Sequence, residues 1–339
     1  MIITKTPFRM SFFGGGTDMP QFFNQNKGAV ISTTFDKYVY VTVRHLPNFF
    51  DYSTEVIYSK AERVKDIDQI EHPMVRNAIK MLKMVDLRIA YDADLPARSG
   101  LGTSSTFAVG LLNAFYSLKG KEESKKKLAD DAIYLERVLC NEAGGWQDQI
   151  AASFGGFNRI DFEDNCYKVT PINISNERKE ILNNNLMLFF TGFTRFSAEI
   201  QKDTSANLEN KNIQLKKMLA LVDQAQEILE NENCDIDEFG ILLDKTWKLK
   251  KETGSKIATS NIDKLYDLGI EAGALGGKLL GAGGGGFLLF YVPKAKQQKV
   301  RDALHYLMEV EFKFENEGTQ IIHKTYGEFD NKFFKEQVE

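Results

Sequence analysis

Glycine and hydroxyl side chains are concentrated in the stretch PARSGLGTSS, residues 96–105. Gly100 and Gly102 allow close backbone approach and unusual φ and ψ angles. Three hydroxyl side chains follow in a row: Thr103, Ser104 and Ser105. An apolar segment with helical periodicity follows, so a helix is expected to begin near these hydroxyls. The free backbone N–H groups at the start of a helix favour the binding of anions. The stretch therefore indicates a loop that binds phosphate and Mg²⁺, with an ordinary capped strand–turn–helix as the alternative.

Two familiar nucleotide fingerprints are absent from this loop. It lacks the G-x-x-x-x-G-K-[ST] pattern, and the third glycine of a G-x-G-x-x-G pattern is replaced by Ser105. The loop is therefore predicted to be neither a Walker A loop nor the fingerprint of a dinucleotide-binding oxidoreductase.

Further chemistry is suggested by a carboxylate beside a glycine pair. Asp148 follows Gly144 and Gly145 in GGWQDQ, and these glycines let the backbone turn sharply, so that the carboxylate can project into a cleft. A helix cap is the alternative role for Asp148.

Two later segments contain groups that suit anions. The block 281–286 is almost entirely glycine, which is costly in regular structure and favours close backbone approach to a ligand over a plain turn. Arg195 follows an apolar strand in TGFTRFS, where its planar fork could bind a phosphate, or where it is simply a surface arginine. Lys278 precedes the glycine block, and its reach toward a cleft is left open.

These groups must be positioned by alternating strands and helices. Apolar alternation and β-branched residues predict strands over 2–13, 29–43, 86–95 and 186–190. Helical spacing of apolar residues predicts helices over 108–118, 128–139, 212–230 and 237–251. Asp18 is predicted to cap a short helix that has Pro20 in its first turn. The polar segment 171–185 lacks an apolar period, so we place a domain boundary there.

Length and composition limit the class of protein. A chain of 339 residues favours two domains, and its net charge of −4 gives no reason to expect nucleic acid or an anionic membrane as partner. We expect no secretory signal and no membrane span. Three widely spaced cysteines and four histidines without a ligand pattern favour a reduced, cytoplasmic protein without structural zinc.

Three motifs in order resemble those of the GHMP kinase superfamily. They are TPFR at 6–9, P-x-x-x-GLG[ST]S at 96–104 and KLLGAGGGGF at 278–287. The resemblance covers nearly the whole chain. It implies an α/β (α+β) two-domain fold, with an N-terminal domain like ribosomal protein S5 domain 2 over 1–175 and a ferredoxin-like C-terminal domain over 176–339.

The resemblance also implies roles for particular residues. ATP phosphates would be bound by Gly100, Leu101, Gly102, Thr103, Ser104 and Ser105. Mg²⁺ would be held by Ser104, with Ser105 as the near alternative, and by Glu136. Glu142 competes for that role, and a solvated helix flank is the other reading of Glu136. Asp148 would accept the proton of the attacking hydroxyl, and Arg9 would pair with Asp148.

The same resemblance implies which residues bind the substrate. GGGTD at 14–18 with GGWQDQ resembles the subgroup of fucokinases and heptose 7-phosphate kinases, and the match to the latter is the closer one. The implied substrate-binding residues are Gly15, Gly16, Thr17, Asp18, Arg195, Gly283, Gly284 and Gly285. The implied reaction phosphorylates the anomeric C1 hydroxyl of D-glycero-D-manno-heptose 7-phosphate to the (α) 1,7-bisphosphate, for nucleotide-activated heptose and surface polysaccharide.

Alternatives stay open at this point. A fucokinase or another anomeric sugar kinase would keep the chemistry with a different sugar. A sugar sensor with the same fold would have lost catalysis, although it would not need Ser104, Glu136, Arg9 and Asp148 together. The apolar face predicted over 212–230 could pack internally or against a second copy in a homodimer.

Overall fold

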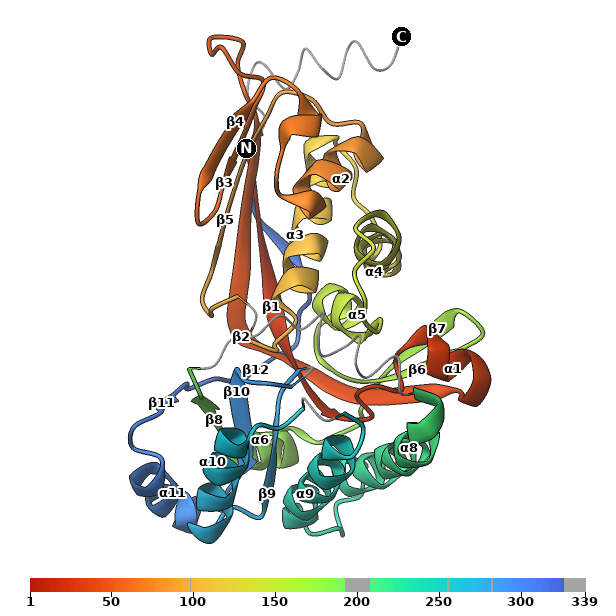
Figure 1. Ribbon diagram of the computed structural model, residues 1–339, viewed down its shortest axis with the longest axis vertical. Coiled ribbons are helices and arrows are strands. Elements are labelled where there is room, and N and C mark those ends of the chain that lie inside the picture. Colours follow the sequence, from red (N-terminus) through yellow and green to blue (C-terminus); the bar gives the residue numbers. More distant parts are fainter. Residues whose placement is uncertain (98, 193–207, 255–256, 282, 326–339) are drawn as a thin grey trace.

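A computed structural model of the chain describes residues 1–97, 99–192, 208–254, 257–281 and 283–325 (Figure 1). Two sheets with helices packed against them form the upper and lower parts of the molecule in this view. The larger sheet has the order β13-β1-β2-β5-β3-β4, with β12 and β6 also paired to β2, and β7 paired to β6.

The strands of the larger sheet come from both ends of the described chain. They are β1 (Ile2–Phe13), β2 (Gly28–His45), β3 (Thr54–Ile57), β4 (Ala61–Val64), β5 (Leu87–Ala93), β6 (Phe157–Glu163), β7 (Cys166–Pro171), β12 (Phe314–Glu315) and β13 (Gln320–Lys324). The strands predicted over 2–13, 29–43 and 86–95 are confirmed as β1, β2 and β5. The first half of β2 pairs with β6 and its second half with β5, so this one long strand joins two parts of the sheet.

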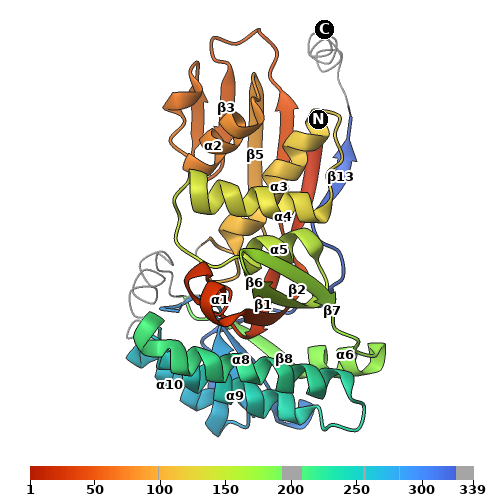
Figure 2. The same cartoon turned by 90° about the vertical axis from the view of Figure 1, so that its right-hand side faces the viewer.

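Helices cover one face of this sheet, as Figure 2 shows for α3 and α4. They are α1 (Pro20–Asn26), α2 (Pro73–Leu82), α3 (Thr103–Leu118), α4 (Lys125–Ile133), the π-helical turn η2 (Tyr134–Leu139) and α5 (Gln147–Phe154), with a short 3₁₀ turn η1 (Ile67–Gln69). From Ser105 to Leu118 every side chain of α3 is buried, because α3 packs on β1 and β2 beneath α4 and α5. Its N-terminus is therefore held rigidly at one end of the sheet.

The smaller sheet is antiparallel with the order β11-β8-β10-β9. Its strands are β8 (Leu186–Phe190), β9 (Gly276–Leu279), β10 (Phe287–Tyr291) and β11 (Met308–Glu309). Its half also contains α6 (Asn176–Asn185), α8 (Leu208–Glu230), α9 (Asp237–Lys251), α10 (Ser260–Glu271), η3 (Lys294–Lys296) and α11 (Gln297–Ala303). The first strand lies between the fourth and the third, which is the ferredoxin-like arrangement expected from the resemblance.

One helix is not predicted by the apolar pattern, and one predicted helix cap is wrong. The polar segment 171–185 contains a helix, α6, whose Ser175 accepts a hydrogen bond from the backbone N–H of Arg178 as an N-cap. Asp18 does not cap α1, because Met19 is the N-cap residue and makes no side-chain cap bond. The predictions over 186–190, 212–230 and 237–251 are confirmed by β8, α8 and α9.

The two halves are joined through β1. Phe12 and Phe13 near the end of β1 pack against Phe239 of α9, with ring centroids 5.3 and 5.1 Å apart. Strands β12 and β13 belong to the range 176–339 yet complete the larger sheet. The boundary after residue 175 stays a prediction, and a single cut there would remove two strands from that sheet.

The apolar face of α8 is buried within the chain. Leu215 and Met218 pack with Met19 and Phe22 of the α1 region, and Val222 lies in the main core. Of the two alternatives for this face, the structure shows internal packing. In the described ranges no helix is long and apolar enough to cross a membrane.

Candidate active site

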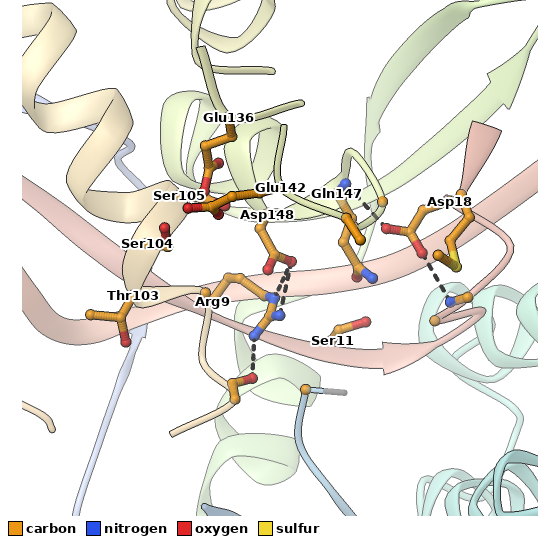
Figure 3. A pocket seen from close by; sticks show the side chains of 18 of the residues that line it. Arg9, Ser11, Asp18, Thr103, Ser104, Ser105, Glu136, Glu142, Gln147 and Asp148 are labelled. Atoms are coloured by element: carbon orange, nitrogen blue, oxygen red, sulfur yellow. Dashed lines mark hydrogen bonds and ion pairs between the residues drawn. The ribbon is translucent and has the colours of Figure 1, made fainter. Parts of the chain in front are cut away.

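A cleft lies where the end of β1, the start of α3, the start of α5 and the loop after β9 meet. Figure 3 shows part of its lining. The lining residues come from both halves of the chain: Arg9, Ser11, Gly15, Gly16, Asp18, Met19, Ser99, Gly100, Gly102, Thr103, Ser104, Ser105, Glu136, Arg137, Glu142, Ala143, Gly145, Gln147, Asp148, Leu215, Lys250, Thr253, Ile257, Lys278 and Gly281. Most of the predicted site residues therefore share one cleft.

The two glycine-rich segments of the sequence touch each other. Gly100 has φ 83°, and a Cβ placed on it would lie 2.3 Å from the carbonyl oxygen of Leu280. A Cβ on Gly286 would lie 2.1 Å from the carbonyl oxygen of Ser99. Only glycine allows this approach of backbone to backbone. The loop before α3 is thereby locked to the loop after β9.

The later glycine block contributes less to the cleft than predicted. Gly281 lines it, whereas Gly284 donates a backbone hydrogen bond of 2.9 Å to Ile257. A Cβ on Gly283 would lie 2.7 Å from Ile257 Cα. Among the residues that the structure describes, Gly283, Gly284 and Gly285 do not line the cleft, and the first two contact Ile257 instead.

The start of α3 provides the donors of an anion site. The hydroxyls of Ser99 and Thr103 are buried and have no hydrogen-bond partner in the described structure. Gly102 has φ 78° and is the N-cap residue of α3, without a side-chain cap bond, and it lines the cleft with Thr103 and Ser104. Leu101 is fully buried in the core, so only its backbone can reach a ligand. Orphaned hydroxyls at a glycine-lined helix start fit the phosphates of ATP.

Two carboxylates face this loop. Glu136 is almost fully buried and accepts a hydrogen bond from the Gln149 amide. Ser104 donates its hydroxyl hydrogen bond to Glu142, and burial together with the charge of Glu136 raises the pKa of Glu142. Figure 3 shows Glu136 and Glu142 on the side of the cleft where α3 begins.

This donor set fits Mg²⁺. The ion takes oxygen ligands and is commonly held by one or two carboxylates together with substrate phosphates. Both Glu136 and Glu142 lie at the cleft, and the one that contacts Ser104 is Glu142, the competing carboxylate of the sequence analysis. No cluster of three or more histidine, cysteine or acidic side chains that could hold a metal occurs within the described ranges.

Arg9 and Asp148 form the ion pair expected from the resemblance. Arg9 Nε and Nη2 each lie 2.8 Å from Asp148 Oδ1. Arg9 Nη1 donates to the Gly100 carbonyl at 2.9 Å, so one buried guanidinium ties the carboxylate to the glycine loop (Figure 3). Asp148 lies in the first turn of α5, and its side chain is 21% exposed. It is accessible to a substrate hydroxyl while Arg9 is not.

Asp18 lies farther along the cleft, on the other side of Asp148 from the start of α3 (Figure 3). Its Oδ1 accepts from Gly16 N at 2.9 Å and its Oδ2 from Gln147 N at 3.3 Å. Burial, and then the charge of Asp148, raise the pKa of Asp18. A Cβ on Gly145 would lie only 1.9 Å from Asp18 Oδ2. The glycine pair before Asp148 therefore makes room for a second carboxylate.

The other predicted substrate residues differ in their placement. Gly15 and Gly16 line the cleft. Thr17 is buried, and its hydroxyl donates to the carbonyls of Gly14 and Ala29, so it holds the turn instead of lining the cleft. Arg195 lies outside the described residues.

Several residues of the cleft were not predicted. Ser11 Oγ and Gln147 Oε1 are buried without a partner on the side of Asp18. Gln147 lies within the GGWQDQ motif, next to Asp148, which is the one signal that could have pointed to it. Lys250 of α9 also lines the cleft, but nothing in the run KLKKE distinguishes it from its neighbours.

Lys278 reaches the cleft from β9 and holds the halves together. Its Nζ donates to the carbonyls of Ser11 and Phe12 of β1, each at 2.8 Å. Burial and then the charges of Lys250 and Arg9 hold the pKa of Lys278 well below its ordinary value.

The sequence of this chain matches a family of known proteins. Residues 73–156 match the GHMP kinases N terminal domain, and residues 220–309 match the GHMP kinases C terminal domain. The chain is 29% identical over 337 residues to D-glycero-alpha-D-manno-heptose 7-phosphate kinase of Campylobacter jejuni, covering 94% of this chain and 98% of that relative.

A second relative is longer than this chain. The bifunctional fucokinase/GDP-fucose pyrophosphorylase of Arabidopsis thaliana is 27% identical over 324 residues, which cover 87% of this chain but only 30% of that protein. The chain therefore spans less than a third of it.

A solved structure matches the chain along its length. The crystal structure of a D-glycero-D-manno-heptose 1-phosphate kinase from Bacteroides thetaiotaomicron superposes with a TM-score of 0.78 at 25% identity, covering 96% of this chain and 100% of the other. With the two domains matched in order around a cleft that fits ATP, the protein belongs to the GHMP kinase family and is an ATP-dependent kinase.

Proposed function

We propose that the protein transfers the terminal phosphoryl group of ATP to the anomeric C1 hydroxyl of D-glycero-D-manno-heptose 7-phosphate, giving the (α) 1,7-bisphosphate. The observation that carries the proposal is the Arg9–Asp148 ion pair, which lies between the glycine loop and the Asp18 side of one cleft. Similarity to the heptose 7-phosphate kinase over almost its whole length supports the choice of sugar.

The residues of the cleft would have separate roles in this reaction. The loop from Gly100 to Ser105 binds the phosphates, and Ser104 with Glu136 and Glu142 would hold Mg²⁺, which neutralises phosphate charge when bound. Asp148 receives the proton of the sugar hydroxyl as its oxygen attacks phosphorus. Its pairing with Arg9 fixes the position of the Asp148 carboxylate, so Asp148 contributes positioning and charge at the reacting hydroxyl.

The sugar would lie on the Asp18 side of the cleft. Asp18 would accept hydrogen bonds from sugar hydroxyls, and the orphaned Ser11 hydroxyl and Gln147 amide oxygen supply further polar partners. Arg195 would bind the phosphate at the far end of the sugar. The product would serve nucleotide-activated heptose and surface polysaccharide synthesis in the cytoplasm.

A fucokinase is the second candidate, because the fucokinase relative is 27% identical across most of this chain. The two candidates differ in whether the cleft must bind a phosphate on the sugar. A sensor that binds sugar without turning it over is a third reading, and the intact Arg9–Asp148 pair speaks against it.

The test is ADP release with Mg-ATP across heptose 7-phosphate, mannose 6-phosphate, free heptose, fucose and galactose. Turnover with the heptose phosphate alone is the expected result. Turnover with fucose or galactose would keep the kinase chemistry and discard the proposed sugar. No turnover across the panel, with ATP still bound, would favour the sensor.

A further inference from the structure

Lys250 is a cation of the cleft for which the proposed mechanism has no use. It lies near the C-terminal end of α9, is partly buried, and lines the cleft together with Arg9 and Asp148. Its Nζ donates one hydrogen bond of 2.5 Å, to the carbonyl of Gly281. Across the described ranges it forms no ion pair, whereas its neighbours Lys248 and Lys251 pair with carboxylates. An ammonium has three donors, so Lys250 has two to spare.

The contacts of Gly281 place Lys250 beside the phosphate loop. A Cβ on Gly281 would lie 2.3 Å from Gly100 Cα, so these two glycines are in direct backbone contact. The carbonyl of Gly100 in turn accepts from Arg9 at 2.9 Å. Lys250 therefore contacts Gly281 from the C-terminal half, and Gly281 packs against Gly100, which Arg9 contacts from β1.

The charges around Lys250 leave it available for an anion. Arg9 is neutralised by Asp148, and Lys278 is engaged by two carbonyls of β1. Burial and the charge of Arg9 lower the pKa of Lys250 to about 8, against the raising effect of Asp18 and Asp148. Most of its population is thus charged at neutral pH, and no carboxylate of the described residues forms an ion pair with it.

The glycine loop contains no lysine or arginine between Gly100 and Ser105. Phosphoryl transfer spreads negative charge over the oxygens of the migrating group, and kinases stabilise this charge with positioned cations. A cation that contacts Gly281 is close to the phosphate loop, because Gly281 is in direct backbone contact with Gly100. These positions favour the terminal phosphate of a nucleoside triphosphate over a phosphate on the sugar.

We propose that Lys250 binds a non-bridging oxygen of the terminal phosphoryl group of ATP and stabilises that group during transfer. The inference rests on the proposed kinase activity. The attacking hydroxyl oxygen forms a bond to the terminal phosphorus, and the bond from that phosphorus to the oxygen bridging to ADP breaks. ADP leaves with the electron pair, and the hydroxyl proton moves to Asp148. Lys250 keeps its protons throughout.

The test compares Lys250→Met with Lys248→Met, which removes the same charge from the exposed side of the same helix. Calorimetry measures the affinity for a non-hydrolysable ATP analogue and for ADP, both with Mg²⁺. In Lys250→Met we expect the analogue to bind about tenfold more weakly and ADP to change by less than about twofold. With a working substrate, kcat should fall by about 10²- to 10³-fold. Lys248→Met should resemble the wild type.

A pH profile supplies a readout that a structural role would not change. In the wild type, kcat/KM for ATP should fall above about pH 8, where Lys250 loses its proton. Lys250→Arg keeps its charge, so its profile should lack this fall up to about pH 10. Lys250→Gln, which retains a donor and similar length, replaces the methionine variant if circular dichroism shows that the latter is unfolded.

Two results would overturn the inference. Equal weakening of both nucleotides would assign Lys250 to the loop structure, and a rise in the sugar KM alone would assign it to the sugar. The nucleotide measurement needs no sugar. If no sugar is phosphorylated but the selective loss of the ATP analogue is found, the proposed reaction fails and the assignment of Lys250 stands.

Discussion

The guanidinium of Arg9 makes contacts to two different parts of the site. It pairs with Asp148, which lies 139 residues away, and it donates to the carbonyl of Gly100 in the phosphate loop. A planar fork can hold both at once, which a lysine ammonium cannot do with the same geometry. The position of the proposed proton acceptor and the shape of the loop therefore depend on one side chain.

Replacement of Asp148 tests this arrangement at the residue scale. In Asp148→Asn we expect kcat to fall by about 10²- to 10⁴-fold, because the amide cannot accept the hydroxyl proton. The affinity for ATP should stay within about twofold, since the loop itself is unchanged. Steady-state kinetics and calorimetry measure the two effects, with the exposed Asp267→Asn as the control. Near-normal turnover would remove Asp148 from the mechanism.

Elements with a strong pattern could be predicted from the sequence, and those fixed by distant contacts could not. The alternation in β1 and β2 and the apolar period in α9 gave boundaries close to those observed. Helix α6 is polar and has only Arg178 and Leu182 buried, so it carries no such period. The one sequence feature that could have indicated the start of α6 is its N-cap residue, Ser175.

Asp18 shows the same limit within the site. An aspartate shortly before a proline suggests a helix cap, but its carboxylate binds Gly16 and Gln147 N–H groups instead. Gln147 lies more than a hundred positions after Asp18 in the chain, and only folding brings the two residues into contact. Lys250 likewise acquires its position from packing against Gly281.

The loop before α5 supplies a test at the element scale. Gly145 has ordinary backbone angles, so Gly145→Ala adds only a methyl group, which would overlap Asp18 Oδ2. We expect the sugar KM to rise by about tenfold or more, because a displacement of about 1 Å in a positioning group is costly. The affinity for ATP should be unchanged. Initial rates at varied sugar concentration measure the effect.

The same substitution in a variant that lacks the Asp18 carboxylate tests whether the overlap causes the rise in KM. In Asp18→Ala, the further change Gly145→Ala should have no additional effect on the sugar KM, since the overlapping carboxylate is gone. Additive losses in the double variant would show that Gly145 acts through another route.

At the scale of the whole molecule, the halves are held together around β1. Phenylalanines at its end pack on α9, and Lys278 of β9 donates to two of its carbonyls. The cleft is bounded by both halves, so its geometry depends on this junction. A buried lysine at such a junction also links stability to pH.

Lys278→Met tests that link. The pKa of Lys278 is held well below its ordinary value in the folded state, so between that lowered pKa and about 10 the unfolded chain binds more protons and stability rises with pH. We expect the unfolding free energy of the wild type, relative to Lys278→Met, to increase by about 1 kcal/mol per pH unit from about pH 8 to pH 10. Urea unfolding measures it, and the exposed Lys294→Met should track the wild type. A constant difference across this range would contradict the prediction.

The pairing of β1 with β13 has a consequence for biosynthesis. Ile2 lies opposite Lys324, so one strand of this pair is synthesised long before the other. One edge of β1 stays without its neighbour until almost the whole described chain has emerged, and an open strand edge invites wrong partners. The first sheet to be translated is thus among the last to be finished, and a stalled nascent chain exposes its unpaired edge.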